Sequence, residues 1–70
     1  MLRLIPVADC VIPPGTKEDK ACTKALDKGE DPFPIVGRYK NGLFRVEQGA
    51  EQVVSCRKLK FLWILALVRD

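Results

Sequence analysis

The apolar positions of the chain fall into short runs separated by proline, glycine and charge, a pattern that predicts strands and helices of modest length. The first run, residues 2–12, reads LRLIPVADCVI and is rich in residues that favour strands. Because Pro6 cannot donate to a sheet ladder, this strand is expected at a sheet edge or in interrupted form. Pro-Pro-Gly at 13–15 ends it.

Residues 16–29 have the spacing of an amphipathic helix. Thr16 is a favourable first cap, and Asp19 stands three positions later, where a capping box places its acidic partner. Gly29 suits the end of the helix. The face expected to turn toward the core consists of small and apolar side chains, namely Ala21, Cys22, Ala25 and Leu26.

Residues 35–40 and 43–47 are strand-like segments joined by Asn41-Gly42. A two-residue type I′ turn needs a positive φ at both positions, which asparagine and glycine adopt more readily than other residues. This dipeptide between two apolar segments is the strongest local signal in the chain, and it predicts a β-hairpin.

The apolar period changes after the hairpin. Over residues 50–60, Val53, Cys56 and Leu59 recur near helical spacing, which predicts a second helix. Residues 62–68 are apolar and bounded by charge, which predicts a closing strand buried on both faces. A membrane-spanning helix needs ~20 apolar residues, so no membrane association is expected.

The resulting order, β-α-β-β-α-β, predicts a small α+β fold in which two helices pack against a sheet. We expect one domain over residues 1–70. A chain of this length buries only about 60% of the surface that its unfolded form exposes, so its stability margin is thin. Help from an exposed sheet edge or apolar patch makes a homodimer a reasonable expectation.

Composition narrows the chemistry further. The chain has no histidine, which removes Ser-His-Asp and Cys-His catalysis. Cys10, Cys22 and Cys56 form no Cys-x-x-Cys motif, so free buried thiols in a reducing cytoplasm are expected. Twelve Lys and Arg against nine Asp and Glu give a net charge of +3, which permits nucleic-acid binding without demanding it.

Basic and aromatic residues alternate in the predicted hairpin, where Tyr39 and Phe44 stand among positive charges. Such a mixture can hold a nucleic-acid backbone and stack bases. The alternative is that Phe44 belongs to the core and the charges are spread over both faces. The candidate nucleic-acid contacts come from the hairpin and the second helix, namely Arg38, Lys40, Arg45, Arg57, Lys58 and Lys60.

The order of elements and several residues resemble the ParB/sulfiredoxin-like domain over nearly the whole chain. Ile5-Pro6-Val7 is similar to the Ile-Pro stretch of that family's first strand, and Pro34-Ile35-Val36, which follows Lys28-Gly29, is similar to its next strand. Beyond the hairpin the chain matches the family pattern in register, and ILALV fits the closing strand. The matching positions there are Val46, Gly49, Cys56 and Leu59.

The resemblance also implies a phosphate-binding turn, and there the chain departs from the family. That turn resembles Gly-Glu-Arg-Arg in ParB proteins and Gly-Cys-His-Arg in sulfiredoxins, whereas this chain has Gly49-Ala50-Glu51-Gln52. Gln52 stands where the resemblance places the arginine that grips phosphate. Ala50 replaces the sulfiredoxin cysteine and Glu51 its histidine, so sulfiredoxin activity is not expected.

A helix N-terminus attracts anions, and Gly49 leaves its backbone open to a phosphate. Glutamine cannot replace the two-pronged, permanently charged guanidinium, and Glu51 adds a negative charge where the phosphate would lie. We therefore expect the fold to persist while binding of a nucleotide, with or without Mg²⁺, is weakened or lost.

Two pairs of carboxylates can hold Mg²⁺, one at Glu30-Asp31 and one formed by Glu47 and Glu51. Some ParB-like domains are described as nucleases, so a metal-dependent nuclease is the alternative for which the chain would be an enzyme. No other catalytic group is identified, and a non-catalytic protein is the main expectation.

Two functions thus remain open. The first is a small binding module, related to ParB domains, that holds a nucleic-acid backbone or a nucleotide phosphate weakly. The second is a protein-interaction module, such as a small phage- or plasmid-encoded inhibitor or regulator of a host protein.

Overall fold

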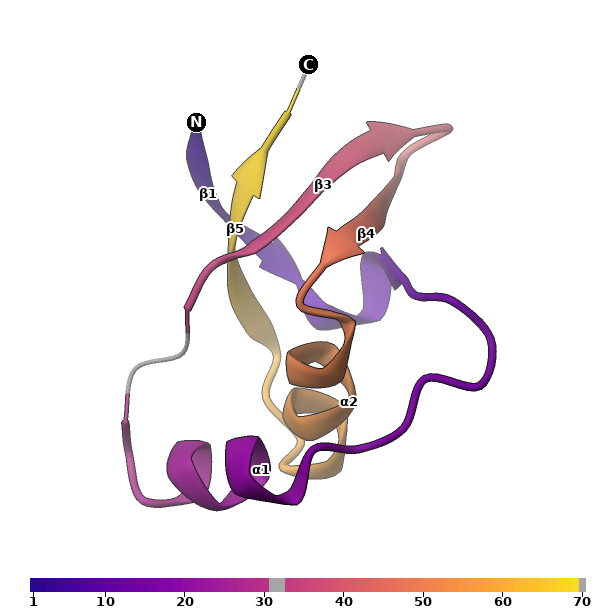
Figure 1. Ribbon diagram of the computed structural model, residues 1–70. Coiled ribbons are helices and arrows are strands. Elements are labelled where there is room, and N and C mark those ends of the chain that lie inside the picture. Colours follow the sequence, from indigo (N-terminus) through magenta and orange to yellow (C-terminus); the bar gives the residue numbers. More distant parts are fainter. Residues whose placement is uncertain (31–32, 70) are drawn as a thin grey trace.

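A computed structural model describes residues 1–30 and 33–69 of the chain. A five-stranded mixed sheet has the order β1-β5-β3-β4-β2, and two helices lie at one end of it (Figure 1). The α+β class and the expected order of elements are confirmed. The elements are β1 (Leu2–Pro6), the 3-10 helix η1 (Val7–Asp9), β2 (Cys10–Val11), α1 (Lys20–Asp27), β3 (Ile35–Lys40), β4 (Leu43–Gln48), α2 (Ala50–Lys58) and β5 (Trp63–Val68).

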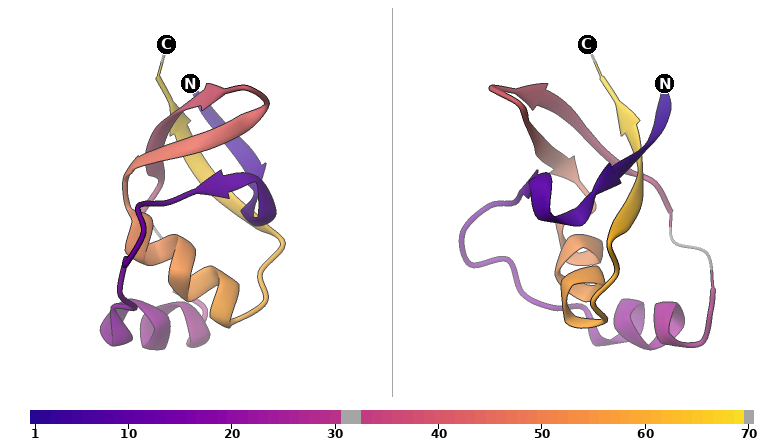
Figure 2. Two further views of the ribbon diagram at one scale, coloured as in Figure 1. Left: turned by 90° about the vertical axis from the view of Figure 1, so that its right-hand side faces the viewer. Right: turned by 180° about the vertical axis from the view of Figure 1, so that it is seen from behind.

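The sheet is strongly curled. Its two edge strands, β1 and β2, are separated along the chain only by η1. A 3-10 helix rises roughly 2 Å per residue, so Pro6 and Cys10 lie close together. In a flat sheet of this order the edge strands would be about 19 Å apart. The sheet therefore curves back on itself, and Figure 2 shows β1 and β2 meeting at η1.

The first predicted strand is both interrupted and at an edge. Val7 donates to the Leu62 carbonyl at 3.0 Å, and the Met1 carbonyl accepts from Val68 at 2.8 Å. Hydrogen-bonding positions alternate along an antiparallel ladder, so the backbone groups of Leu2, Leu4 and Pro6 point away from β5. The missing N–H of proline thus falls on the open edge, where it costs no ladder bond.

The first helix begins later than its sequence suggests, at Lys20 rather than just after Thr16. The Asp19 carboxylate is the actual cap and accepts from the N–H groups of Ala21 and Cys22 at 3.0 and 3.3 Å. Thr16 instead donates its hydroxyl to the Pro13 carbonyl at 2.6 Å and closes the preceding turn. Thr16 and Asp19 could each cap the helix. The Thr16 hydroxyl is already bonded to the Pro13 carbonyl of the preceding turn, so Asp19 caps the helix instead.

The hairpin is confirmed. Asn41 and Gly42 have φ values of 55° and 80°, as a type I′ turn requires. Tyr39 and Phe44 face each other across the strands, with ring centroids 5.4 Å apart in an edge-to-face arrangement. Gly37 is needed farther along β3, because a Cβ there would collide with the Arg45 carbonyl.

The core lies between the concave side of the sheet and α2, and α1 packs on α2 (Figure 1). Ile64 and Ala66 of β5 point into this core, but Trp63 and Leu67 are 57% and 40% exposed. The prediction that β5 is buried on both faces was wrong, because helices cover only one side of the sheet. The buried apolar residues are Ile5, Val7, Cys10, Leu26, Ile35, Phe44, Val46, Val53, Cys56, Ile64 and Ala66.

Candidate functional site

The turn between β4 and α2 is built around Gly49. This glycine caps α2 in a left-handed conformation, with φ 91°, and no side chain caps the helix there. Its carbonyl accepts from the N–H of Gln52 at 3.0 Å. A Cβ at this position would lie 2.8 Å from Cγ2 of Ile35. Packing against β3 and a positive φ therefore account for the glycine without any ligand.

Gln52, where the resemblance places a phosphate-gripping arginine, is already engaged. Its side-chain amide donates to the main-chain carbonyl of Phe33 at 2.5 Å and ties the first turn of α2 to the segment before β3. Beside it is an open hollow of about 380 Å³. Its lining is mainly apolar, with carboxylates rather than cations on its rim: Asp19, Ala21, Cys22, Ala25, Leu26, Glu30, Phe33 and Gln52.

The carboxylates proposed as metal ligands do not gather. Glu47 forms ion pairs with Arg38 at 3.3 Å and with Arg69 at 3.0 Å, which neutralise it, and Glu51 is exposed on the first turn of α2. Asp31 lies outside the described residues. Within residues 1–30 and 33–69, no three potential ligand side chains come together. The two sides of the turn therefore offer no preformed Mg²⁺ site.

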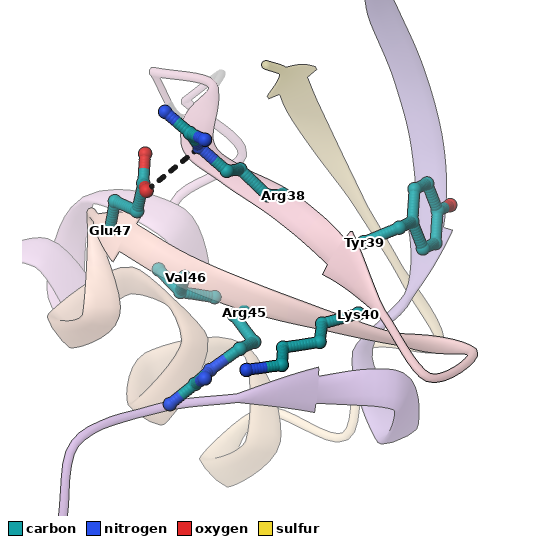
Figure 3. Close-up of a pocket in the computed structure, with 6 residues that line it drawn as sticks. All are labelled: Arg38, Tyr39, Lys40, Arg45, Val46 and Glu47. Carbon is teal, nitrogen blue, oxygen red and sulfur yellow. Dashed lines mark ion pairs between the residues drawn. The ribbon is translucent and has the colours of Figure 1, made fainter. Parts of the chain in front are cut away.

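The hairpin brings three cations onto one face. Phe44 and Val46 of β4 point into the core, so Arg45 and Glu47 point outward. Arg38 lies directly opposite Arg45 in the ladder. Together with Lys40 these arginines surround an open hollow of about 420 Å³, and Figure 3 shows the side chains of Lys40 and Arg45 converging on one side of it.

Lys40 and Arg45 have no carboxylate within ion-pair distance in the described part of the chain. Arg38, in contrast, is paired with Glu47. The convergent pair is therefore a place where positive charge accumulates without an internal counter-ion. Of the two possibilities for Phe44, the core is the correct one, because its side chain is fully buried.

The basic residues of α2 do not join this surface. Arg57 donates to the Cys10 carbonyl at 2.6 Å, and Lys58 pairs with Glu18 at 3.0 Å. Lys60 follows the helix at φ 63° and lines a separate hollow with Arg57. The predicted nucleic-acid set is thus divided between the outer face of the hairpin and the C-terminal end of α2.

A hydrogen-bond network between α1 and α2, which was not predicted from the sequence, joins Ser55, Thr23 and Glu18. The hydroxyl groups of Ser55 and Thr23 share a hydrogen bond of 2.7 Å, and Thr23 is also 2.7 Å from the Glu18 carboxylate. Ser55 is the buried polar residue of the core. The Thr23 hydrogen bond, and then Lys58, hold the pKa of Glu18 below its usual range. Serine and threonine on helix faces are too common to predict such a pairing.

The cysteines are free, and Cys10 and Cys56 are buried, as expected. Burial raises the pKa of the Cys56 thiol to about 11. Burial also raises the pKa of Cys10, although the nearby Arg57 acts in the opposite direction. Both thiols are therefore held in their unreactive, protonated form at neutral pH.

No helix in residues 1–30 and 33–69 is both long and apolar enough to cross a membrane.

No family model matches this sequence, and no curated protein sequence matches it significantly. Solved structures do. Sulfiredoxin from Arabidopsis thaliana superposes with a TM-score of 0.82 at 17% identity, covering all of this chain and 85% of that one. C-terminally truncated ParB from Caulobacter crescentus, complexed with CTP-gamma-S, gives 0.82 at 14% identity.

A second structure of the Caulobacter ParB, complexed to the centromeric parS site, gives a TM-score of 0.74 at 15% identity and covers 97% of this chain. The chain spans less than half of each ParB, 44% and 38% respectively. At such low identity these likenesses concern the fold alone, and the fold of this chain is the ParB/sulfiredoxin-like fold.

Proposed function

We propose that this protein is a small non-catalytic module that binds a nucleic-acid backbone through the outer face of its β3–β4 hairpin. The observation that carries the proposal is the convergence of Lys40 and Arg45, without an acidic partner in the described residues, beside Arg38. One of the ParB structures with this fold was solved on DNA, which supports a nucleic-acid ligand here as well.

The electrostatics of the hairpin favour an anion that bridges the strands. Arg38 and Arg45 are directly opposite, and like charges in such pairs destabilise a sheet. Glu47 neutralises the charge of Arg38, but no carboxylate of the described residues neutralises the positive charge of Lys40 and Arg45 near the tip of the hairpin. A phosphate in the hollow would neutralise that end through charge-assisted hydrogen bonds from Lys40 and Arg45. Such contacts position a backbone and do not read a base sequence.

A nucleotide phosphate at the Gly49–Gln52 turn is the weaker proposal for a ligand. It is supported by the ParB structure that contains CTP-gamma-S and by the uncapped start of α2. Against it stand the engagement of Gln52 by Phe33 and the carboxylates around the neighbouring hollow. An amide NMR titration with CTP or ATP and Mg²⁺ distinguishes this turn from the hairpin by the residues whose signals shift.

The test of the main proposal is the salt dependence of binding to a fluorescent DNA duplex of arbitrary sequence. If about three phosphates are contacted, log K should fall with log salt concentration with a slope near −2.7. Lys40→Ala and Arg45→Ala should each weaken binding and reduce the slope by about one unit. Lys24→Ala, an exposed lysine on α1, is the matched control and should change neither quantity.

The proposal fails if no binding is detected at low salt, or if Lys24→Ala weakens binding as much as Lys40→Ala does. A duplex of unrelated sequence should bind with equal affinity. A strong preference between duplexes would contradict backbone recognition, because contacts to phosphates carry no sequence information.

A protein-interaction module is the second candidate. It is favoured by large apolar side chains on the outer side of β1 and β5, among them Leu4 and Trp63, which are 65% and 57% exposed. Exposed apolar patches of this kind commonly mark interaction surfaces.

A further inference from the structure

The strand β1 has one unpaired edge along its five residues. Its other edge pairs with β5, and in residues 1–30 and 33–69 no strand covers the open side. The backbone groups that point outward belong to Leu2, Leu4 and Pro6, by the alternation described above. Two of these residues supply a free N–H, and Pro6 supplies only a carbonyl.

The usual protections of an open edge are weak here. Edge strands are commonly guarded by charged side chains, proline, bulges or very short length, and β1 has a proline only at its last position, Pro6. In β1 the one charged residue is Arg3, whose guanidinium lies 5.6 Å from the centre of the Tyr39 ring rather than over the open edge. Leu2 and Leu4 are 57% and 65% exposed on the outer side, beside Leu65 and Leu67 of β5.

We propose that the occupant of this edge is a second copy of the chain, paired antiparallel through β1 with Leu4 opposite Leu4. In this register the Leu4 N–H of each copy donates to the Leu4 carbonyl of the other. The Leu2 N–H of each copy donates to the Pro6 carbonyl of the other. Every free donor of the edge then has an acceptor, and the absence of an N–H in proline leaves no donor unpaired.

The register with Leu4 opposite Leu4 is preferred over the other symmetric register, which places the two-fold axis at Arg3. A two-fold axis at Arg3 would also pair the backbones, but it would place two arginines directly opposite each other, which is unfavourable. The axis at Leu4 places Arg3 opposite Ile5 and brings two exposed leucines into contact on the outer face. The interface matches itself in hydrogen bonding and charge, as a two-fold contact requires.

The interface is small, so the dimer should be weak. A five-residue strand is about 17 Å long, and an edge contact of that size falls well short of the ~800 Å² per partner that stable complexes bury. We expect dissociation constants in the range of hundreds of micromolar. In the sheet order β5 separates β1 from the hairpin, although the curl of the sheet brings Arg3 to 5.6 Å from the Tyr39 ring. The pairing itself uses only residues of β1, so Arg38, Lys40 and Arg45 are not part of it.

The experiment is sedimentation equilibrium from about 10 μM to 1 mM, combined with amide hydrogen exchange. The average mass should rise toward that of a dimer across this range, and the Leu2 and Leu4 amides should become protected only at the higher concentrations. Leu4→Lys should abolish both effects, because it places like charges opposite each other at the two-fold axis. Phe33→Lys, an equally drastic change at a side chain that is 85% exposed elsewhere, should abolish neither.

Circular dichroism establishes that each variant is folded. A purely monomeric mass at 1 mM would overturn the proposal. So would a dimer that survives Leu4→Lys, or one in which the Leu4 amide stays unprotected, since either would place the contact on another surface.

Discussion

The side-chain amide of Gln52 donates a 2.5 Å hydrogen bond to the main-chain carbonyl of Phe33. This contact joins two segments that are 19 positions apart, and it fixes the segment preceding β3 against the first turn of α2. The position that the family resemblance assigns to a phosphate clamp is therefore used as a structural tether. Introducing an arginine there would replace the amide that makes this contact and would add a positive charge at the same time.

We predict that Gln52→Arg alone does not create a nucleotide site. Glu51 remains beside it, and the carboxylates of Asp19 and Glu30 stay on the rim of the adjoining hollow. Loss of the tether should cost about 1 kcal/mol of unfolding free energy. The double variant Glu51→Arg/Gln52→Arg should bind CTP or ATP measurably, because both the charge and the bidentate donor are then present.

Isothermal titration with millimolar nucleotide measures this prediction, and Gln52→Ala is the control for loss of the tether alone. Submillimolar binding by Gln52→Arg would show instead that the turn had lost only its guanidinium and had otherwise kept a working site.

Gly49→Ala should destabilise the protein more than a left-handed glycine normally does. Forcing an L-residue to a positive φ costs roughly 1–2 kcal/mol. At Gly49 the new Cβ would also lie 2.8 Å from Ile35, and this overlap should add about 1–3 kcal/mol. Gly29 has nearly the same φ, 88°, with open space around it, so Gly29→Ala measures the strain alone.

Urea unfolding of both variants gives the difference in unfolding free energy. Equal losses for Gly29→Ala and Gly49→Ala would mean that Ile35 moves aside without cost, and Gly49 would then need an explanation other than packing.

Local sequence signals predicted most of the fold. Asn41-Gly42 specified the hairpin because the turn conformation depends on those two residues alone. The ends of the elements were less accurate. Thr16 and Asp19 are both good caps, and the choice between them depends on the Pro13 carbonyl, which becomes available only once the preceding turn has formed.

The site could be predicted less well, because contacts between distant segments decide it. No local pattern reveals that Gln52 reaches Phe33 or that Glu47 is neutralised by Arg69. The exposed side of β5 was missed for a similar reason, since an apolar run does not show how many faces its neighbours cover. In contrast, strand alternation alone places Arg38, Lys40 and Arg45 on one face once the hairpin is accepted.

The buried Ser55 hydroxyl makes Thr23 a sensitive position. Thr23→Val keeps the shape of the side chain but leaves Ser55 without its 2.7 Å partner, which should cost about 1–3 kcal/mol. Ser55→Ala should cost less, because Thr23 keeps its bond to Glu18. In the double variant the loss should be smaller than the sum of the two single losses by about 1 kcal/mol.

A double-mutant cycle by urea unfolding at neutral pH measures this coupling. Strict additivity would show that the two hydroxyl groups do not depend on each other. Thr23→Val should also bring the pKa of Glu18 back toward its ordinary value, which carboxyl NMR titration detects.

The buried thiol of Cys56 should make the protein less stable in alkali. Its pKa is about 11 in the folded protein against an ordinary value of 9.0. Between these values the unfolded chain has lost the proton and the native protein retains it, so the free energy of unfolding must fall as pH rises. The contribution is fully present below pH 9 and is lost as the pH approaches 11.

Urea unfolding at several pH values from 8 to 11 checks this, with the slope rather than the absolute stability compared between variants. Cys56→Ala should flatten the decline, whereas Cys22→Ala should flatten it only in part, because burial is the main cause of the raised pKa of Cys56 and the neighbouring Cys22 a smaller one. Every other ionisable group is common to the parent protein and the Cys56→Ala variant, so only the difference between their slopes reports on Cys56. If Cys56→Ala declined as steeply as the parent protein, the thiol would be ionising in the folded state at its ordinary pKa, and the packing of α2 against the sheet would be looser than its contacts indicate.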